Sequence, residues 1–186
     1  MRKNFGAKPI TYPQPVFVIA AYGEDGVPDA MEAAWAGISD DKEISACISA
    51  GHRTTKNILA SGAFTVSMAD AAHVTQCDYL GIVSANTVPD KFARAGFHAT
   101  KSRLVNAPLI DELPVAVECR LVSYDRESCR LVGEIVNVCA DESVLNAQGK
   151  IDPAKLRPVS FDPMNNAYLV VGEKVGNAYE DGKKLK

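Results

Sequence analysis

The chain has 186 residues, of which 47% are hydrophobic, a proportion that predicts one folded domain and excludes a disordered chain. A formal net charge of −3 excludes a generally basic surface that would attract nucleic acid or anionic membranes. Five cysteines without C-x-x-C spacing argue against a zinc site and a disulfide framework. We therefore expect a cytoplasmic protein with reduced thiols. It would form a single domain over residues 1–186, with a core at about 8–175 and a mobile C-terminal tail.

The first third of the chain predicts three consecutive strands. A β-rich run over Gln14–Tyr22 is closed by a hairpin turn at Gly23–Gly26. A second strand is expected over Pro28–Trp35, ending at Gly37, and a third over Lys42–Ser49. Short turns between consecutive strands favour antiparallel pairing.

The middle of the chain predicts short helices around one strand. In chain order, these elements are a helix over Arg53–Ser61, a strand over Ala63–Met68, a helix ending at about Leu80, and a helix over Lys91–Ala95. Gly62 and Gly96 end the first and third helices, because glycine readily adopts the left-handed conformation of a helix terminus. Asp70 is expected to cap the second helix.

The last third returns to strands. Two long alternating runs, Leu113–Tyr124 and Arg130–Cys139, flank the polar loop Asp125–Ser128 and predict a hairpin. A final strand is expected over Ala167–Val171. Strands with helices inserted only in mid-chain do not fit a βαβ pattern. They favour a mainly β fold, an antiparallel barrel with short helical excursions.

The densest polar cluster, Ser49–Asn57, lies where a predicted strand ends and a helix begins. The first N–H groups of a helix lack intrahelical partners and carry partial positive charge, so they attract anions. Cationic and hydroxyl side chains accompany them: Arg53, Thr54, Thr55 and Lys56. The residues are compatible with a monophosphate site and also with an ordinary, capped and solvated helix start. P-loop and dinucleotide-binding spacings are absent.

Two further clusters have a functional and a structural interpretation. The segment Met31–Ser39 places the only tryptophan, Trp35, among small residues, which suits either a flat ligand or a core position. The segment Tyr79–Asn86 leads to Lys91, which either covers a ligand edge or is simply solvated. The three histidines lie in unrelated contexts, and neither a nucleophile elbow nor metal-ligand spacing is present.

Segments spread over about residues 8 to 175 carry a resemblance to a known family. In chain order they are Ala33–Gly37, Ser49–Asn57, Gly62–Ser67, Asp78–Ser84, Pro89–Gly96, and Ala107–Pro114 with the strand ending at Glu118 and Cys119. Their order and spacing resemble the flavin reductase-like, FMN-binding split-barrel family, most closely its flavoredoxin branch. The resemblance implies a split β-barrel, a six-stranded antiparallel Greek-key barrel with short inserted helices, that forms a homodimer.

The resemblance also implies FMN as the cofactor, with its phosphate on Ser49–Asn57 and its ring framed by Trp35. The implied cofactor-binding residues are Trp35, Ala36, Gly37, Ile38, Ser49, Ala50, Arg53, Thr54, Thr55, Lys56, Asn57, Ser84, Lys91 and Phe161. No catalytic side chain and no metal are expected, because FMN itself carries the chemistry. The chain departs from many relatives at Asp29–Glu32, where they carry Asn or Thr and an acid would oppose an anionic reduced flavin.

Two versions of an FMN-dependent oxidoreductase follow from the resemblance. One is a flavin reductase that takes electrons from NAD(P)H, and the other is a flavoredoxin-type carrier between protein partners. A non-catalytic binding barrel, for instance for single-stranded nucleic acid, is the alternative from another class. It would require aromatic and basic residues interleaved along the strands, whereas strand aromatics are few and the net charge is negative. We expect neither a nucleic-acid nor a membrane partner.

Overall fold

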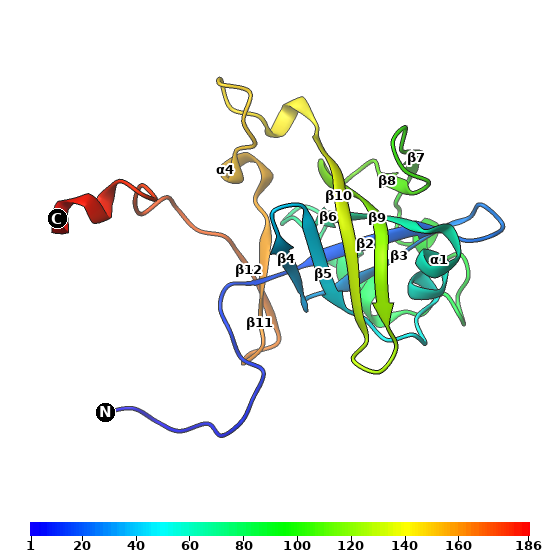
Figure 1. Ribbon diagram of the computed structural model, residues 1–186, viewed down its shortest axis with the longest axis horizontal. Helices are drawn as coiled ribbons and strands as arrows, with labels where there is room; N and C mark the ends of the chain where they lie inside the picture. The colour runs from blue at the N-terminus through cyan, green and yellow to red at the C-terminus, as the bar shows by residue number, and fades with distance from the viewer.

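A computed structural model describes residues 1–186 and shows a mainly β protein (Figure 1). The strands are β1 (Gln14–Pro15), β2 (Phe17–Tyr22), β3 (Pro28–Ala33), β4 (Ala36–Asp40), β5 (Glu43–Cys47), β6 (Ala63–Met68), β7 (Ala99–Lys101), β8 (Pro108–Ile110), β9 (Val115–Asp125), β10 (Arg130–Ala140), β11 (Val159–Asp162) and β12 (Ala167–Val170). The helices are α1 (Arg53–Ser61), α2 (Val74–Ile82), α3 (Lys91–Arg94) and α4 (Pro153–Leu156), with 3-10 turns at Glu142–Val144 and Asp181–Leu185. No helix is both long and apolar enough to cross a bilayer.

The main sheet has seven strands in the order β3-β2-β6-β9-β10-β5-β4, and all its pairings are antiparallel. The sheet curls, but its edge strands β3 and β4 are not hydrogen-bonded to each other. Side chains close the interior instead: Met31 from β3 and Ile44 from β5 belong to one buried cluster, against which Ala36 of β4 packs. The predicted split-barrel class is confirmed, with seven strands in the sheet rather than six.

Strand β2 divides two hydrophobic cores. Because successive side chains of a strand point to opposite faces, Ile19 and Ala21 face the barrel interior, whereas Val18 and Ala20 face the second core. The second core is covered by α2, α3, β8 and β11. Both faces of β2 are therefore buried, which explains its nearly continuous apolar sequence.

Two small sheets complete the fold, and neither was predicted from sequence. The predicted strand Gln14–Tyr22 is interrupted at Val16, so β1 pairs with β11 while β2 pairs with β3 and β6. Strand β12 completes that three-stranded sheet, and β7 pairs with β8 in a separate ribbon. The predicted strand over Pro28–Trp35 ends at Ala33, and β4 follows as a separate strand that pairs with β5.

The predicted start of the second helix was wrong. Helix α2 begins at Val74, and Asp70 instead accepts hydrogen bonds from the backbone N–H groups of Ala72 and His73 in the preceding turn. Asp70 also forms an isolated β-bridge with Pro158, which holds it in extended backbone. The carboxylate therefore stabilises a turn that leads into the helix rather than the helix itself.

Candidate functional site

The N-terminus of α1 presents unsatisfied hydrogen-bond donors. The backbone N–H groups of Arg53, Thr54 and Thr55 have no acceptor. His52, which precedes the helix, contributes no side-chain cap, and the first turn contains no acidic residue. These free N–H groups, together with the positive end of the helix, make this position suited to an anion.

The side chains of the first turn fall into two pairs. Arg53 and Lys56 are exposed, and Lys56 Nζ lies 3.4 Å from Asn86 Oδ1. Thr54 is buried, and its hydroxyl donates to Asp29 Oδ2 at 2.6 Å. Thr55 is fully buried, and its Oγ1 has no hydrogen-bond partner. Of these four residues, only Arg53 and Lys56 therefore reach the surface, whereas the hydroxyls of Thr54 and Thr55 are buried.

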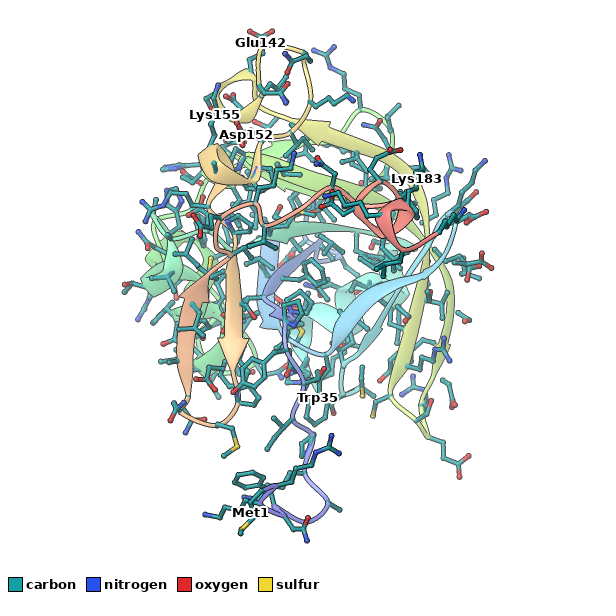
Figure 2. All side chains as sticks on the ribbon, turned by 90° about the vertical axis from the view of Figure 1, so that its left-hand side faces the viewer. Met1, Trp35, Glu142, Asp152, Lys155 and Lys183 are labelled. Atoms are coloured by element: carbon teal, nitrogen blue, oxygen red, sulfur yellow. The ribbon has the colours of Figure 1, made fainter.

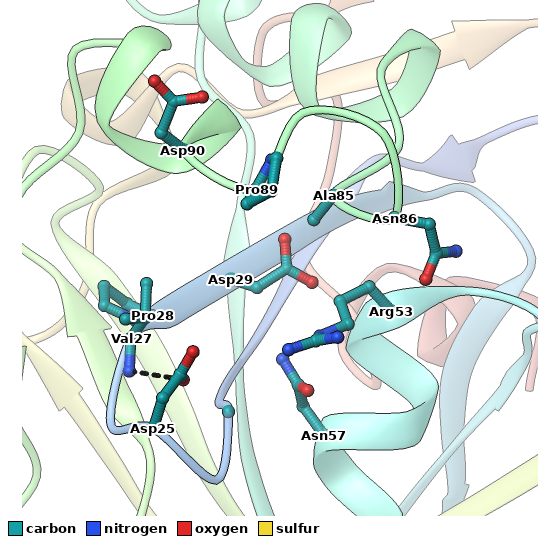
Figure 3. Close-up of a pocket in the computed structure, with 11 residues that line it drawn as sticks. Asp25, Val27, Pro28, Asp29, Arg53, Asn57, Ala85, Asn86, Pro89 and Asp90 are labelled. Carbon is teal, nitrogen blue, oxygen red and sulfur yellow. Dashed lines mark hydrogen bonds between the residues drawn. The ribbon is translucent and has the colours of Figure 1, made fainter.

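A cavity of about 420 Å³, the acidic cavity, lies on one side of Arg53 (Figure 3). Its lining residues are Gly23, Asp25, Val27, Pro28, Asp29, Arg53, Asn57, Ala85, Asn86, Pro89 and Asp90. In Figure 3, Arg53 and Asn57 extend from α1 toward Asp29 on β3. Because the lining contains three carboxylates and one cation, this cavity repels phosphate and favours groups that donate hydrogen bonds.

Asp29 is the buried polar centre of this region, with only 4% of its surface exposed. Its Oδ1 has no hydrogen-bond partner. The nearest cation, Lys91, places Nζ 3.7 Å from Oδ1, which is an ion-pair distance but too long for a hydrogen bond. Asp29 thus retains a free acceptor.

Lys91 is not a solvated surface lysine, which was one of the two interpretations of its sequence position. The residue is 3% exposed, and its Nζ donates to the carbonyl oxygens of Leu80 at 3.1 Å and Val83 at 3.0 Å, at the end of α2. Burial lowers the pKa of Lys91, and the charge of Asp29 opposes that shift. Its observed role is to terminate α2 and to balance the buried carboxylate.

A smaller cavity of about 260 Å³, the helix-end cavity, shares Arg53 and Ala85 with the acidic cavity. Its lining residues are Met31, His52, Arg53, Thr54, Leu80, Gly81, Ile82, Val83, Ser84, Ala85 and Lys91. The fold therefore brings Ser84 to the start of α1, although about thirty residues separate them in the chain. This cavity contains no carboxylate, so it is the better place for an anion.

The predicted ring-binding segment forms the edge of the main sheet. The Trp35 carbonyl accepts from Cys47 N–H at 2.8 Å, and Gly37 pairs with Ser45. Strand β5 then continues into the loop that holds Ser49 and Ala50, so the Trp35 segment and the α1 N-terminus are joined through one strand. The Trp35 side chain is 58% exposed beside a cavity of about 400 Å³ that also contains Ile38.

Phe161 lies apart from Lys91, on the small sheet. It pairs with Gln14 of β1 and Tyr168 of β12, and its side chain is half-buried. Gln14 Nε2 donates to the Ala34 carbonyl at 3.2 Å, which attaches this sheet to the residue before Trp35. Phe161 is thus linked to the Trp35 end of the site, whereas Lys91 belongs to the α1 end.

No sequence pattern predicts the carboxyl cluster that lies between β3, α2 and β12. The Tyr168 hydroxyl lies within hydrogen-bond distance of both Glu32 and Asp78. Burial raises the pKa of Glu32 to about 7, and the nearby charge of Asp78 acts in the same direction. These residues are too far apart in the chain for any local pattern to connect them.

Comparisons with known proteins complete the description of the site. A sequence model of the flavin reductase-like domain matches residues 10–155. The solved flavoredoxin of Desulfovibrio vulgaris (Miyazaki F) is 36% identical, with a TM-score of 0.93 over 98% of this chain and 100% of that chain. Flavoredoxin from Methanosarcina acetivorans is 28% identical, with a TM-score of 0.86 over 100% and 98% of the two chains.

One curated relative is longer than this chain. It is an uncharacterized protein of Aeropyrum pernix, 32% identical over 114 residues, which are 61% of this chain and 43% of that relative. The matched region therefore spans less than half of that relative's length.

Proposed function

Because the chain belongs to the flavin reductase-like family, we propose that it is a flavoprotein that binds FMN and passes electrons or hydride through it. The observation that carries the proposal is the N-terminus of α1, where three backbone N–H groups lack acceptors beside two exposed cations. A phosphate dianion satisfies these donors and is neutralised by Arg53 and Lys56. The family membership makes FMN the phosphate-bearing ligand of choice.

The residues fit the other parts of FMN as well. In this proposal, the phosphate lies on the helix-end cavity, near Ser84, because the acidic cavity repels it. The free Oδ1 of Asp29 and the amide of Asn57 are available to hydroxyl groups of the sugar-alcohol chain. When bound, FMN supplies the two-electron chemistry. The protein contributes binding, orientation and hydrogen bonds.

The edge strand β4 suits a flat polar ring. An edge strand leaves a row of backbone N–H and C=O groups unpaired on its outer side. Beside these groups, the exposed Trp35 offers an aromatic face. Together they supply stacking and hydrogen bonds for the isoalloxazine ring, and Phe161 borders the same end of the site.

Direct measurement of FMN binding tests this proposal. Purified protein should be yellow, or should quench the fluorescence of added FMN at micromolar concentrations with one site per chain. Colourless protein that leaves FMN fluorescence unchanged would contradict it. Riboflavin is the matched control ligand, because it has the same ring without the phosphate. It should bind at least tenfold more weakly, since a charge-assisted hydrogen bond contributes about 1.5–3 kcal/mol.

Two electron donors fit the proposed site, NAD(P)H or a redox protein. Anaerobic stopped-flow reduction of the FMN-bound protein separates them. Reduction within seconds by NADH or NADPH identifies a flavin reductase. If bound FMN stays oxidised for minutes, the flavoredoxin-type carrier is the function that remains.

We propose further that the protein is a cytoplasmic homodimer. Trp35 and Ile38 are 58% and 69% exposed at the same sheet edge, an arrangement that supports burial against a second copy. The five unpaired cysteines suit a reducing compartment. Sedimentation velocity at micromolar concentration tests the dimer.

A further inference from the structure

Two free cysteines are neighbours where β5 ends beside the turn between β9 and β10. Cys47 is the last residue of β5 and pairs with Arg130, which directly follows Cys129 in the chain. The backbone N–H of Ile48 donates to the Cys129 carbonyl at 2.9 Å. Neighbouring strands lie about 4.7–4.9 Å apart, and a disulfide spans about 4.4–6.8 Å between Cα atoms. A disulfide can therefore bridge the two backbones.

The Cys47 side chain extends toward the turn that contains Cys129. Cys47 Sγ lies 3.7 Å from the carbonyl oxygen of Ser128, the residue bonded to the Cys129 nitrogen. Cys129 Sγ lies 3.9 Å from the Arg126 carbonyl oxygen, within the same turn. Burial raises the pKa of Tyr124, and negative charge on Cys129 or Cys47 acts in the same direction. The Tyr124 hydroxyl is thus near both thiols.

Cys129 has an unusual backbone conformation for a cysteine. Its φ of 58° lies in the left-handed region, which is uncommon for residues other than glycine, asparagine and aspartate. Such strain costs conformational energy and is typical of functional positions. Because Cys129 precedes β10, its side chain does not follow the alternation of that strand. It is therefore not confined to the face opposite Cys47.

Cys47 is the more accessible of the two thiols. It is exposed, and it lines a cavity of about 400 Å³ together with Trp35 and Ser128. Figure 2 shows Trp35 at the end of the barrel where the β9–β10 hairpin turns. Cys129 is only partly exposed. A small oxidant from solvent therefore reaches Cys47 first, and Cys129 is placed to react second.

The other three cysteines lie in different surroundings. Cys77 and Cys119 are buried, and burial raises the pKa of each thiol to about 12, so they are unreactive. Cys139 lies near the far end of β10 from the turn. Two accessible thiols are therefore neighbours at Cys47 and Cys129.

We propose that Cys47 and Cys129 form a reversible disulfide when the protein meets hydrogen peroxide. First, Cys47 Sγ attacks the peroxide: an S–O bond forms, the O–O bond breaks, and water leaves a sulfenic acid on Cys47. Cys129 Sγ then attacks Cys47 Sγ: an S–S bond forms, the S–O bond breaks, and a second water leaves. Two thiols thereby lose two electrons and two protons, and one peroxide becomes two waters. Disulfide formation does not depend on the proposed flavin function.

Thiol counting and peptide mapping on the full chain test the proposal. After brief treatment with a slight excess of hydrogen peroxide, the free thiols of the denatured protein should fall from five to three. Trypsin digestion without reduction should then release residues 43–53 joined to residues 127–130. Dithiothreitol should restore all five thiols. Five remaining thiols, or oxidation without the linked peptides, would overturn the proposal.

Cys129→Gly removes the second thiol and keeps the turn, because glycine readily adopts a left-handed backbone. In this variant the oxidised Cys47 should persist as a sulfenic acid, detected with dimedone. Equal dimedone labelling of the variant and the unaltered protein would show that Cys129 does not react with Cys47. Cys139→Ser is the matched control, because Cys139 is also partly exposed, and it should leave the linked peptides unchanged.

Electrophoresis without reductant separates a bond within one chain from a bond between chains. This distinction matters because the proposed dimer uses the edge that contains Trp35, beside Cys47. Oxidised protein should migrate as a single chain. A covalent dimer would mean that the thiols react across two copies, and the proposed disulfide within one chain would be wrong.

Discussion

The Tyr168 hydroxyl lies 3.0 Å from Glu32 Oε2, and a second carboxylate oxygen, Asp78 Oδ1, lies 2.7 Å from the same hydroxyl. A phenol has one hydrogen, so it donates to only one of the two carboxyl groups. The arrangement is satisfied when Glu32 is protonated and donates to Tyr168, which in turn donates to Asp78. Three elements, β3, α2 and β12, are then joined by two hydrogen bonds, each with its own hydrogen.

The first prediction concerns the pH dependence of stability. Burial raises the pKa of Glu32 from 4.5 to about 7. Between these values the folded state binds more protons than the unfolded state, so stability falls as pH rises from about 4.5 to about 7 and is then constant. The contribution of Glu32 should be about 1–2 kcal/mol, because the carboxyl is not fully shielded from water. Urea denaturation at several pH values measures it.

Glu32→Gln is the matched variant, because an amide mimics the protonated acid. It should flatten the pH dependence in this window and be more stable than the parent above pH 7. The buried thiol of Cys77 also feels the charge of Glu32, but burial raises its pKa to about 12, so it does not titrate here. A pH profile that is the same in parent and variant would show that folding does not shift the pKa of Glu32.

The second prediction concerns the proposed phosphate site. Replacing Arg53 and Lys56 by alanine together should weaken FMN binding at least tenfold and leave riboflavin binding nearly unchanged, because only the phosphate loses contacts. Fluorescence titration measures both affinities. Lys150→Ala, an exposed lysine in the loop before α4, is the control and should have no effect. An equal loss for both ligands would place these cations near the ring instead.

The third prediction concerns the buried pair Lys91 and Asp29. Lys91→Met removes the cation 3.7 Å from the carboxylate and the two hydrogen bonds that end α2. The expected loss is about 3–5 kcal/mol of unfolding free energy, because Asp29 is left as an unpaired buried charge. Adding Asp29→Asn removes that charge and should recover part of the loss. If the losses of unfolding free energy caused by the two substitutions simply add, Lys91 stabilises the protein through the end of α2 alone.

The fourth prediction concerns the exposed sheet edge. Ile38→Lys should shift the protein from dimer to monomer in sedimentation velocity, because a lysine at the centre of an apolar contact is costly to bury. Val122→Lys, at an exposed position on β9, is the control. A dimer that survives Ile38→Lys would show that the subunits associate through another face.

The sequence was sufficient wherever one local pattern decides the structure. The hairpin β9–β10 follows from alternation around a polar loop, and α1 follows from a change of period that ends at Gly62. The family resemblance added the split barrel and the FMN proposal. The predicted and observed elements agree here because the alternation of a strand and the residues that end a helix are local properties of the chain.

Pairings between distant segments could not be predicted in this way. Strand β1 has only two residues, and its partner β11 follows about 145 residues later, so no local signal defines either. Strand β4 is exposed along most of its length and therefore lacks the alternation that marks half-buried strands. The burial of Thr54 could not be predicted either, because it depends on a hydrogen bond from the Thr54 hydroxyl to Asp29, which lies on another element.

The last prediction concerns a close approach inside the barrel. A Cβ added to Gly133 on β10 would lie 2.3 Å from Cζ and 2.7 Å from Cε1 of Phe64, which is 1% exposed in the core. Gly133→Ala should therefore destabilise the protein by about 1–3 kcal/mol, the usual cost of overpacking. Gly172→Ala, where an added Cβ meets nothing within 4 Å, is the matched control. Combining Gly133→Ala with Phe64→Leu shortens the obstructing side chain, so the double variant should lose less than the sum of the two single variants in urea denaturation. If the losses of unfolding free energy are strictly additive, the added methyl group at position 133 does not press on the Phe64 ring, and the prediction is wrong.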